Sequence, residues 1–285
     1  MFEGRTWASP SAIIVPYFAV RRPPPPPFRR KHMDLGLANK RAVVTGGTKG
    51  IGRAIVETLA AEGCHVAFCA RNAAEVEATS QALAGRGVKV FGRALDVGDG
   101  AALKAWVDDA AKAFGGLDIA IANVSALATA PGEQSWQQAF NIDILGTIRL
   151  VEAAIPHLEQ SDSGAIVNIA STAGREVDAA AGSYGAMKAA LIHYTKGLAH
   201  RLAAKRIRAN VVSPGTIYFD GGVWDRIKTG LPDRYAGAMA RNPLGRMGTP
   251  EEVASAAAFL ASPRASFTTG TNLLVDGAIT RGVQF

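Results

Sequence analysis

From Arg41 onward, short runs of apolar and β-branched residues alternate with longer segments in which apolar residues recur every three or four positions. Short continuous apolar runs are typical of strands buried on both faces, and the wider spacing is typical of helices with one buried side. The predicted strands are Arg41–Thr45, His65–Ala70, Val88–Leu95, Asp118–Asn123, Ala165–Ala170, Arg208–Val212 and Leu273–Val275. The predicted helices are Ile51–Glu62, Ala74–Ala84, Gly100–Phe114, Trp136–His157, Tyr184–Ala204 and Pro250–Ala261.

This alternation indicates repeated βαβ units. It predicts an α/β fold over residues 33–285, a single doubly wound Rossmann domain with a seven-stranded parallel sheet flanked by helices. Ligand sites in such folds lie at the carboxyl ends of the strands. The stretch Gly215–Gly248 breaks the alternation and is rich in Gly, Tyr, Trp and Arg. Its length predicts a substrate lid over the site.

Residues 1–32 differ in composition from the rest of the chain. They hold seven of the 14 prolines, five of them consecutive, and they contribute +5 of the formal net charge of +7. Consecutive prolines favour polyproline II and donate no backbone hydrogen bonds. We therefore expect a disordered Pro/Arg-rich extension upstream of a natural start at Met33. A secretory or organelle-targeting leader is the alternative interpretation.

Composition excludes several classes of protein. Hydrophobic residues make up 48% of the chain, enough for a sizeable core, yet no apolar stretch reaches the roughly 18–20 residues that span a bilayer. The folded part carries too little net positive charge for a nucleic-acid-binding face. Cys64 and Cys69 are expected to be buried thiols in a reducing compartment. The expected protein is cytoplasmic, binds a small molecule, and needs no metal, nucleic acid or membrane.

A glycine-rich turn directly follows the first predicted strand and opens a helix. It reads Thr45-Gly46-Gly47-Thr48-Lys49-Gly50-Ile51-Gly52. Glycines allow the backbone to approach a pyrophosphate closely, and the helix N-terminus supplies free N–H groups. Because ordinary turns use the same residues, the strand–turn–helix setting is what makes this a candidate cofactor site.

The residues after the second predicted strand bear on the choice of cofactor. Ala70 supplies no carboxylate to bind the adenosine ribose hydroxyls, whereas Arg71 can bond a 2′-phosphate and Lys49 can add a second cation. This favours NADP over NAD. The alternative is that both cations are solvated surface charges.

Tyr184 and Lys188 stand four residues apart in a predicted helix, and so share one of its faces. An ammonium beside a phenol favours the phenolate and makes tyrosine a usable proton donor. Because this spacing also arises by chance, a solvated helix face is the alternative.

His193 is expected to pack or to face a neighbouring subunit. Trp136 and Phe140 are expected in the core or at an interface rather than stacked on a ligand.

The glycine-rich octet resembles the cofactor turn of the short-chain dehydrogenase/reductase family, and the resemblance covers nearly all of residues 35–285. It implies that Ser171 steadies the substrate oxygen, Tyr184 transfers the proton and Lys188 holds the nicotinamide ribose. It also implies that Asn141 completes the catalytic group by holding a water for proton relay. The cofactor-binding residues implied are Gly46, Thr48, Lys49, Gly50, Ile51, Gly52, Arg71, Asp96, Val97, Asn123, Tyr184, Lys188, Pro214, Gly215 and Ile217.

Two positions depart from the family pattern. The segment around Asn123 reads Ala122-Asn123-Val124-Ser125 where the family has N-N-A-G, which leaves the bracing role of this asparagine open. Phe219 stands where the family usually has a threonine.

The resemblance implies an NADP-dependent oxidoreductase that interconverts a ketone and a secondary alcohol, similar to 3-oxoacyl-thioester reductases. It also implies a homotetramer, packed through the Trp136–His157 and Tyr184–Ala204 helices. The alternatives are an NAD(P)-dependent sugar or secondary-alcohol dehydrogenase and, from another class, a non-catalytic cofactor-binding sensor.

The side chains of the lid suggest a class of substrate. Its aromatic and aliphatic residues favour a bulky, apolar carbonyl compound, and its basic residues favour an acidic group remote from that carbonyl, such as the phosphates of a carrier thioester. The alternative is that the aromatics anchor the lid to the body of the protein or to a neighbouring subunit. The residues concerned are Tyr218, Phe219, Trp224, Ile227, Leu231, Tyr235 and Met239, with Arg226, Lys228 and Arg234.

Overall fold

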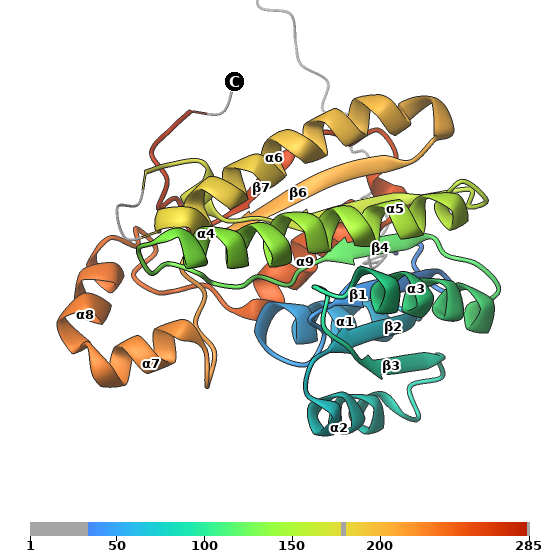
Figure 1. Cartoon of the computed structure of the whole chain (residues 1–285), viewed down its shortest axis with the longest axis horizontal. Helices are drawn as coiled ribbons and strands as arrows, with labels where there is room; N and C mark the ends of the chain where they lie inside the picture. The colour runs from blue at the N-terminus through green and yellow to red at the C-terminus, as the bar shows by residue number, and fades with distance from the viewer. Residues whose placement is uncertain (1–33, 178–180, 284–285) are drawn as a thin grey trace, which may run out of the picture. The chain divides into compact units, whose positions relative to one another are not determined.

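A computed structural model of the chain describes residues 34–177 and 181–283. Seven strands form one parallel sheet in the order β3-β2-β1-β4-β5-β6-β7 (Figure 1). The strand order reverses between β1 and β4, and this switch point opens a crevice at their carboxyl ends. The predicted doubly wound sheet is thus confirmed. Its strands are β1 (Arg41–Thr45), β2 (His65–Ala70), β3 (Val90–Ala94), β4 (Ile119–Ala122), β5 (Ala165–Ile169), β6 (Arg208–Pro214) and β7 (Asn272–Val275).

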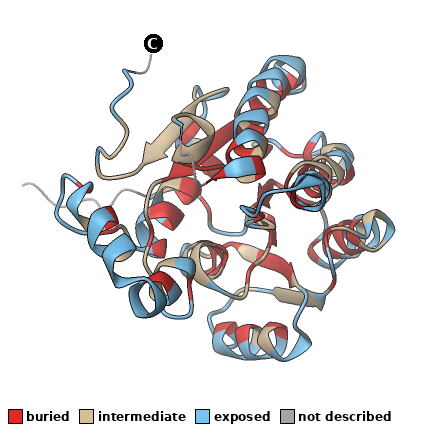
Figure 2. Ribbon diagram, turned by 60° about the vertical axis from the view of Figure 1, so that its left-hand side comes forward, coloured by how far each residue is buried: buried red, intermediate tan, exposed pale blue. Residues whose placement is uncertain are grey.

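Helices cover both faces of the sheet. One buried cluster joins the sheet to α1 (Gly50–Ala61) and α9 (Pro250–Ala261), with α2 (Ala73–Leu83) at its edge. A second cluster joins the opposite face to α3 (Gly100–Phe114), α5 (Gly146–Leu158) and the C-terminal half of α6 (Gly182–Leu202). Figure 2 shows the result: buried strands in the middle, and helices buried only on their inner sides.

The central strands are buried on both faces, which explains their uninterrupted apolar sequences. In β1, Val44 belongs to the α1/α9 cluster and Val43 to the α3/α5/α6 cluster, and both are fully buried. Burying each such side chain contributes about 1.5–3 kcal/mol of transfer free energy. Cys64 and Cys69 are buried free thiols, and burial raises the pKa of the Cys69 thiol to about 12. They pack as small apolar residues, as predicted.

Two segments differ from the sequence prediction. The single helix expected over Trp136–His157 is α4 (Glu133–Ala139), a π-helical turn (η1, Phe140–Leu145) and then α5. The stretch expected to be a lid contains two short helices, α7 (Val223–Gly230) and α8 (Pro232–Ala240). Short helices with few buried positions give little periodicity to find. The expected extension over residues 1–32 lies outside the described residues, and within residues 34–177 and 181–283 no helix has the length and apolarity of a membrane span.

One buried carboxylate joins the amino ends of the central strands. Asp118, directly before β4, accepts hydrogen bonds from the Arg41 guanidinium at 2.7 and 2.9 Å and from the Ser161 hydroxyl at 2.6 Å. Burial opposes the charged form of Asp118, but these hydrogen bonds outweigh it and hold the pKa of Asp118 below its ordinary value. The ion pair lies at the opposite end of the sheet from the crevice.

The Asp118→Asn variant should therefore lose about 1.5–3 kcal/mol of unfolding free energy at pH 7, because the hydrogen bonds between the charged guanidinium and the carboxylate are lost or weakened. A carboxyl group with a depressed folded-state pKa stabilises above its unfolded pKa near 4, and this contribution is lost as the pH falls through the folded value. Urea unfolding should show the two proteins converging below pH 4. The matched control Asp162→Asn breaks an exposed pair with Lys40 and should change stability by less than about 0.5 kcal/mol. Equal losses in both variants would contradict the assignment.

Candidate active site

The glycine-rich turn lies between the carboxyl end of β1 and the first residues of α1. Gly46 has a φ of 72°, in the left-handed region, and the amides of Gly46 and Gly47 donate to the Cys69 carbonyl at the end of β2. The turn is thereby tied to the neighbouring strand. No side chain caps the N-terminus of α1, so its N–H groups are available to bind an anionic group.

Gly52 allows α1 to pack against the turn. A Cβ at this position would overlap both the Gly46 carbonyl oxygen and the Asn123 side-chain amide. That amide donates to the carbonyls of Thr45 and Gly46 at 3.2 and 3.3 Å, and the Asn123 N–H donates to the Thr45 hydroxyl at 3.1 Å. Asn123 thus joins β4 to the end of β1 through the backbone, despite the departure from the family pattern around it.

The predicted adenosine-binding residues follow the next two strands. Arg71 follows β2 and is exposed, and among the described residues its side chain forms no hydrogen bond or ion pair. The Asn72 side chain accepts the N–H groups of Ala74 and Glu75 and so begins α2 immediately after Arg71. After β3, Asp96 is exposed and accepts the Gly98 N–H at 2.8 Å, which fixes the turn there.

Lys49 is not a free cation in this structure. Its ammonium lies 2.7 Å from a Glu75 carboxylate oxygen, and the Thr48 hydroxyl donates to the other oxygen at 3.1 Å. The hydrogen bond from Lys49 is the main cause that lowers the pKa of Glu75. The sequence prediction that Lys49 faces a 2′-phosphate missed this partner, which comes from α2.

Tyr184 and Lys188 lie on α6 beside the carboxyl end of β5. The Lys188 side chain is 2% exposed, and its ammonium lies 5.5 Å from the centroid of the Tyr184 ring and 3.3 Å from the Ile169 carbonyl, to which it donates. Ser171 follows β5 two residues later, is buried, and accepts the Ala173 N–H at 3.1 Å. The structure therefore holds a half-buried phenol next to a buried ammonium, at the edge of the sheet where the glycine turn lies.

The structure does not bring Asn141 to this group. Its side-chain oxygen accepts from Arg149 at 3.2 Å, near Gly98. The residue beside Lys188 is Asp143: one carboxylate oxygen lies 3.1 Å from the Lys188 ammonium, and the other accepts the Ala126 N–H at 2.9 Å. Two residues along a helix correspond to roughly 200° of rotation, so the two side chains point to nearly opposite sides.

A signal for Asp143 was present in the sequence. It falls on the buried side of the segment together with Ala139, Gly146 and Leu150, at helical spacing. A charged residue on an otherwise buried helix side requires a partner. The π-helical turn adds to this: the Gly146 N–H bonds the Asn141 carbonyl five residues back, and the Asp143 carbonyl accepts the Thr147 hydroxyl. Such turns occur frequently at functional sites.

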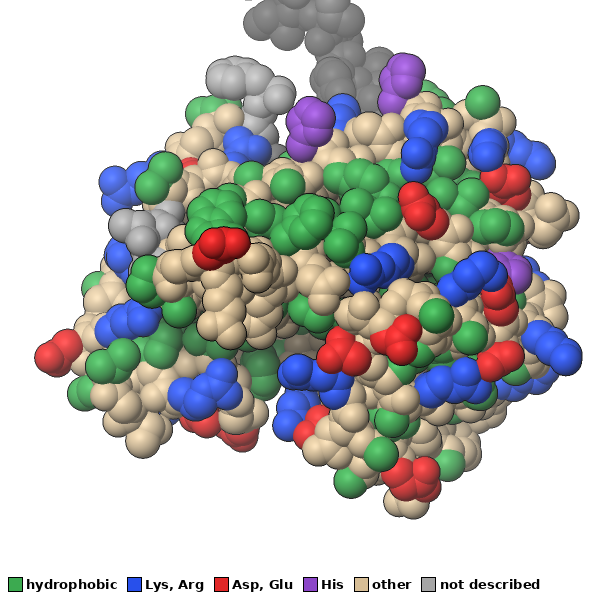
Figure 3. All heavy atoms as spheres, in the orientation of Figure 1, with side chains coloured by type: hydrophobic (Ala, Val, Ile, Leu, Met, Phe, Trp, Pro, Cys, Tyr) green, Lys and Arg blue, Asp and Glu red, His purple; other side chains and the backbone are tan. Residues whose placement is uncertain are grey.

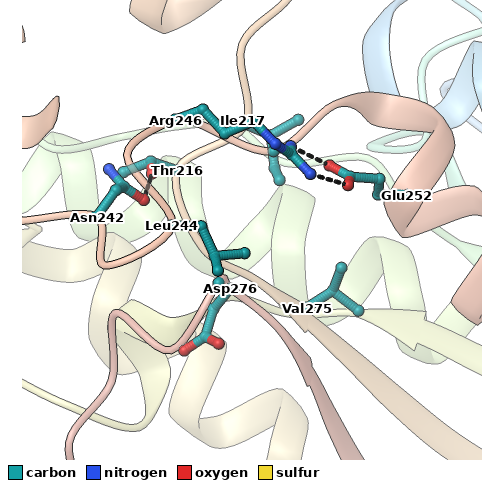
Figure 4. Close-up of a pocket in the computed structure, with 10 residues that line it drawn as sticks. Thr216, Ile217, Asn242, Leu244, Arg246, Glu252, Val275 and Asp276 are labelled. Carbon is teal, nitrogen blue, oxygen red and sulfur yellow. Dashed lines mark hydrogen bonds and ion pairs between the residues drawn. The ribbon is translucent and has the colours of Figure 1, made fainter.

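The segment after β6 is fixed at its base. The Gly215 N–H donates to the Val275 carbonyl, and Ile217 forms a parallel bridge with Gly248, so the start and end of the lid segment 215–248 are held together. A cavity of about 90 Å³ lies at this base (Figure 4). It is far smaller than the ~300–1,000 Å³ of ordinary ligand sites, so it is too small to be the substrate site by itself.

Two side-chain contacts hold the walls of this cavity. Thr216 donates to Asn242 at 2.8 Å, and Arg246 forms a two-pronged pair with Glu252 at 2.6 and 2.9 Å (Figure 4). The hydrogen bonds from Arg246 are the largest influence on Glu252 and lower its pKa to about 2.

The lid aromatics have two kinds of partner. Tyr218 and Tyr235 pack edge to face at 6.4 Å, with the Lys228 ammonium over both rings, and the Tyr218 hydroxyl donates to Asp225. These contacts lie within the segment 215–248 itself, whereas the alternative interpretation expected its aromatics to contact the body of the protein or a neighbouring subunit. Phe219 instead lies against the glycine turn, because a Cβ on Gly50 would come within 2.5 Å of its ring.

Comparisons with known proteins agree with this architecture. A family model described as enoyl-(acyl carrier protein) reductase matches residues 46–280. The chain is 39% identical to isoepoxydon dehydrogenase of Aspergillus clavatus over 87% of its length and 98% of the relative. It is 39% identical to cis-4-hydroxycyclohexanecarboxylate dehydrogenase of Sinomonas cyclohexanicum over 87% of its length and 99% of the relative.

A solved structure supports the same grouping. The L-sorbose reductase of Gluconobacter frateurii, in complex with NADPH and L-sorbose, superimposes with a TM-score of 0.82 at 28% identity, covering 88% of this chain and all of that one. The chain belongs to the short-chain dehydrogenase/reductase family. It is accordingly an NAD(P)(H)-dependent oxidoreductase that acts on alcohol and carbonyl groups.

The glycine turn can be tested by substitution. Gly52→Ala should abolish detectable cofactor binding in calorimetry, because α1 must move away from the Gly46 carbonyl. The control is Gly197→Ala in α6, where an added Cβ meets no atom within 4 Å. It should retain binding and gain up to about 1 kcal/mol of stability, because alanine favours a helix interior. Unchanged affinity in Gly52→Ala would show that the turn does not form the cofactor site.

Proposed function

We propose that the protein is an NADP-dependent ketoreductase that interconverts a ketone and a secondary alcohol, with Tyr184 as proton donor. The observation that carries the proposal is the buried Lys188 ammonium 5.5 Å from the ring of a half-buried Tyr184, at the carboxyl end of β5. In a dry site an ammonium stabilises a nearby phenolate more strongly than in water.

The chain's own residues then have separate tasks. When bound, the cofactor supplies the hydride. Negative charge develops on the substrate oxygen, and the hydroxyls of Ser171 and Tyr184 are the donors placed to stabilise it. Tyr184 gives its proton to that oxygen, and Lys188 stabilises the phenolate that remains. In the oxidative direction, the same phenolate accepts the alcohol proton.

The preference for NADP rests on the end of β2. Ala70 offers no carboxylate, and Arg71 is exposed at the start of α2, free to bond a phosphate on the adenosine ribose. Lys49 reaches the same region once its pair with Glu75 opens. The complex of L-sorbose reductase with NADPH, at a TM-score of 0.82, agrees with this choice.

Titration of both cofactors into the protein should show tighter binding of NADP than of NAD. Arg71→Ala should weaken NADP binding at least about tenfold and leave NAD binding nearly unchanged, because only the phosphate contact is lost. Ala70→Asp should reverse the preference by repelling the phosphate. Tighter binding of NAD by the unaltered protein would refute the cofactor assignment.

The proposed substrate is a bulky, largely apolar ketone, including 3-oxoacyl thioesters and ring ketones. Phe219 extends from the lid to the glycine turn, and the lid carries further apolar side chains, Val223 and Leu231, that are exposed. The Sinomonas relative acts on a ring alcohol that carries a carboxylate. A sugar remains the second candidate because the structural neighbour was solved with L-sorbose.

A panel of substrates under one set of conditions separates these candidates. Catalytic efficiency with NADPH should be at least about tenfold higher for a 3-oxoacyl thioester or a ring ketone than for L-sorbose, since apolar burial favours the former. Tyr184→Phe should lose at least about a hundredfold in kcat while still binding cofactor. A preference for L-sorbose would favour the sugar dehydrogenase, and cofactor binding without turnover of any substrate would favour a sensor.

A homotetramer is part of this proposal. Trp136 and Phe140 are 47% and 48% exposed, so they are not core residues. Figure 3 shows hydrophobic side chains gathered over α4 and between α5 and α6 on the same face. An apolar patch of this kind marks an interaction site, and closed symmetry is the usual arrangement for identical subunits.

A further inference from the structure

We propose that Asp143 is a positioning residue that offsets the charge of Lys188 and thereby keeps the proton on Tyr184 up to a higher pH. The inference rests on the proposed function, in which Tyr184 is the proton donor. It concerns a residue that sequence reasoning passed over in favour of Asn141.

The ion pair between Asp143 and Lys188 is buried. The Lys188 ammonium and the nearer Asp143 oxygen are 3.1 Å apart, and the two side chains are 2% and 1% exposed. The Ala126 N–H holds the other carboxylate oxygen at 2.9 Å. The nearer oxygen has no aligned hydrogen bond among the described residues, so its contact with Lys188 is chiefly one of charge. Such a pair is retained because either charge alone would be costly to bury.

Its effect on Tyr184 follows from Coulomb's law. An isolated ammonium 5.5 Å from the phenol ring stabilises the phenolate directly. A carboxylate in contact with that ammonium repels the phenolate from nearly the same position, and so cancels part of the attraction by the ammonium. The phenolate then experiences a dipole rather than a full charge, and the phenol is favoured. With a neutral amide at position 143, the full positive charge of the Lys188 ammonium would act on the Tyr184 phenolate.

The other charged groups around the pair face elsewhere. The strands that end beside it, β4 and β5, carry no titratable side chain. On the other elements packed around the pair, each described titratable side chain apart from Tyr184 and Tyr194 is either hydrogen-bonded to another group or exposed. The hydrogen-bonded ones are Glu133 with Gln137, Arg149 with Gly98, His157 with Asp108, Arg175 with Val283, Glu176 with the Arg281 and Gly282 amides, Lys196 with Gly270, and Arg208 with Leu260. The exposed ones are Glu152, His193, His200 and Arg201. Tyr194 lies farther along α6, where burial raises its pKa to about 12. Within residues 34–177 and 181–283, Asp143 is therefore the anion in contact with Lys188.

The functional consequence is a bias in protonation. Reduction requires Tyr184 to carry its proton, so the reductive rate falls at high pH when that proton is lost. Oxidation requires the phenolate, so the oxidative rate falls at low pH. In this proposal, both limits lie at higher pH with Asp143 than they would with a neutral side chain at the same position.

The test is the pH dependence of kcat/KM for Asp143→Asn, measured with the best ketone of the panel and NADPH and, in reverse, with its alcohol and NADP. Asparagine has the same shape and still accepts the Ala126 N–H. Both pH limits should move down by about one pH unit when the charge is removed. If Asp143→Asn does not fold, as judged by its Tm, Asp143→Ser removes the same charge and keeps an acceptor oxygen.

Asp118→Asn is the matched control. It removes another buried, cation-paired carboxylate at the opposite end of the sheet, so its Tm should fall while both pH limits stay in place. The inference would be overturned if the Asp143 variants turned over substrate with unchanged pH limits of kcat/KM. That outcome would leave the proposed function standing. An unaltered enzyme that turns over no carbonyl compound would instead refute the proposed function.

Discussion

The close approach of α1 to the ends of β1 and β4 is the contact on which the remaining site depends. Gly52 leaves no room for a side chain between the helix and the Gly46 carbonyl, and the Asn123 amide occupies the remaining space. This packing turns the N-terminus of α1 toward the crevice, where the strand order reverses. Because all seven strands are parallel, every loop that follows a carboxyl end meets at this one edge. The cofactor turn and the tyrosine–lysine group are therefore neighbours although about 135 residues separate them in the sequence.

The proposed catalytic group of Tyr184 and Lys188 is organised around a buried charge. Lys188 is held by the Ile169 carbonyl and by Asp143, so its ammonium cannot swing away from the Tyr184 ring. The π-helical turn places Asp143 there, and α5 continues against the sheet from Gly146, directly after the turn. A small change in helix winding thus decides which acidic or amide side chain reaches the lysine. The geometry makes the electrostatics of the proton donor depend on a segment that contributes nothing to the cofactor turn.

Much of this could be predicted from the sequence because parallel strands and the glycine turn have local signatures. β1 and β2 match their predicted bounds, since buried strands are continuous apolar runs. Asn141 was chosen from the family resemblance alone, and the structure places its side chain against Arg149, while the buried side of the same segment carries Asp143. The pairing of Lys49 with Glu75 joins the turn before α1 to α2, and no local sequence pattern reports such a contact. The same holds for the lid aromatics, whose partners depend on how α7 and α8 fold together.

The bridge between Ile217 and Gly248 separates two requirements that often conflict in enzymes, a rigid reaction centre and surrounding helices that tolerate substitution. Everything on the body side of that bridge, from the glycine turn to Lys188, must stay rigid for proton transfer to work. The helices beyond it are attached by two adjoining strands of backbone and make most of their aromatic contacts with each other. Substitutions in α7 and α8 can therefore accumulate without disturbing the catalytic body. Under the proposed function, a lineage with this arrangement can change the molecules it accepts while keeping one chemistry, because substitutions that alter selectivity and substitutions that alter reactivity fall in different parts of the chain.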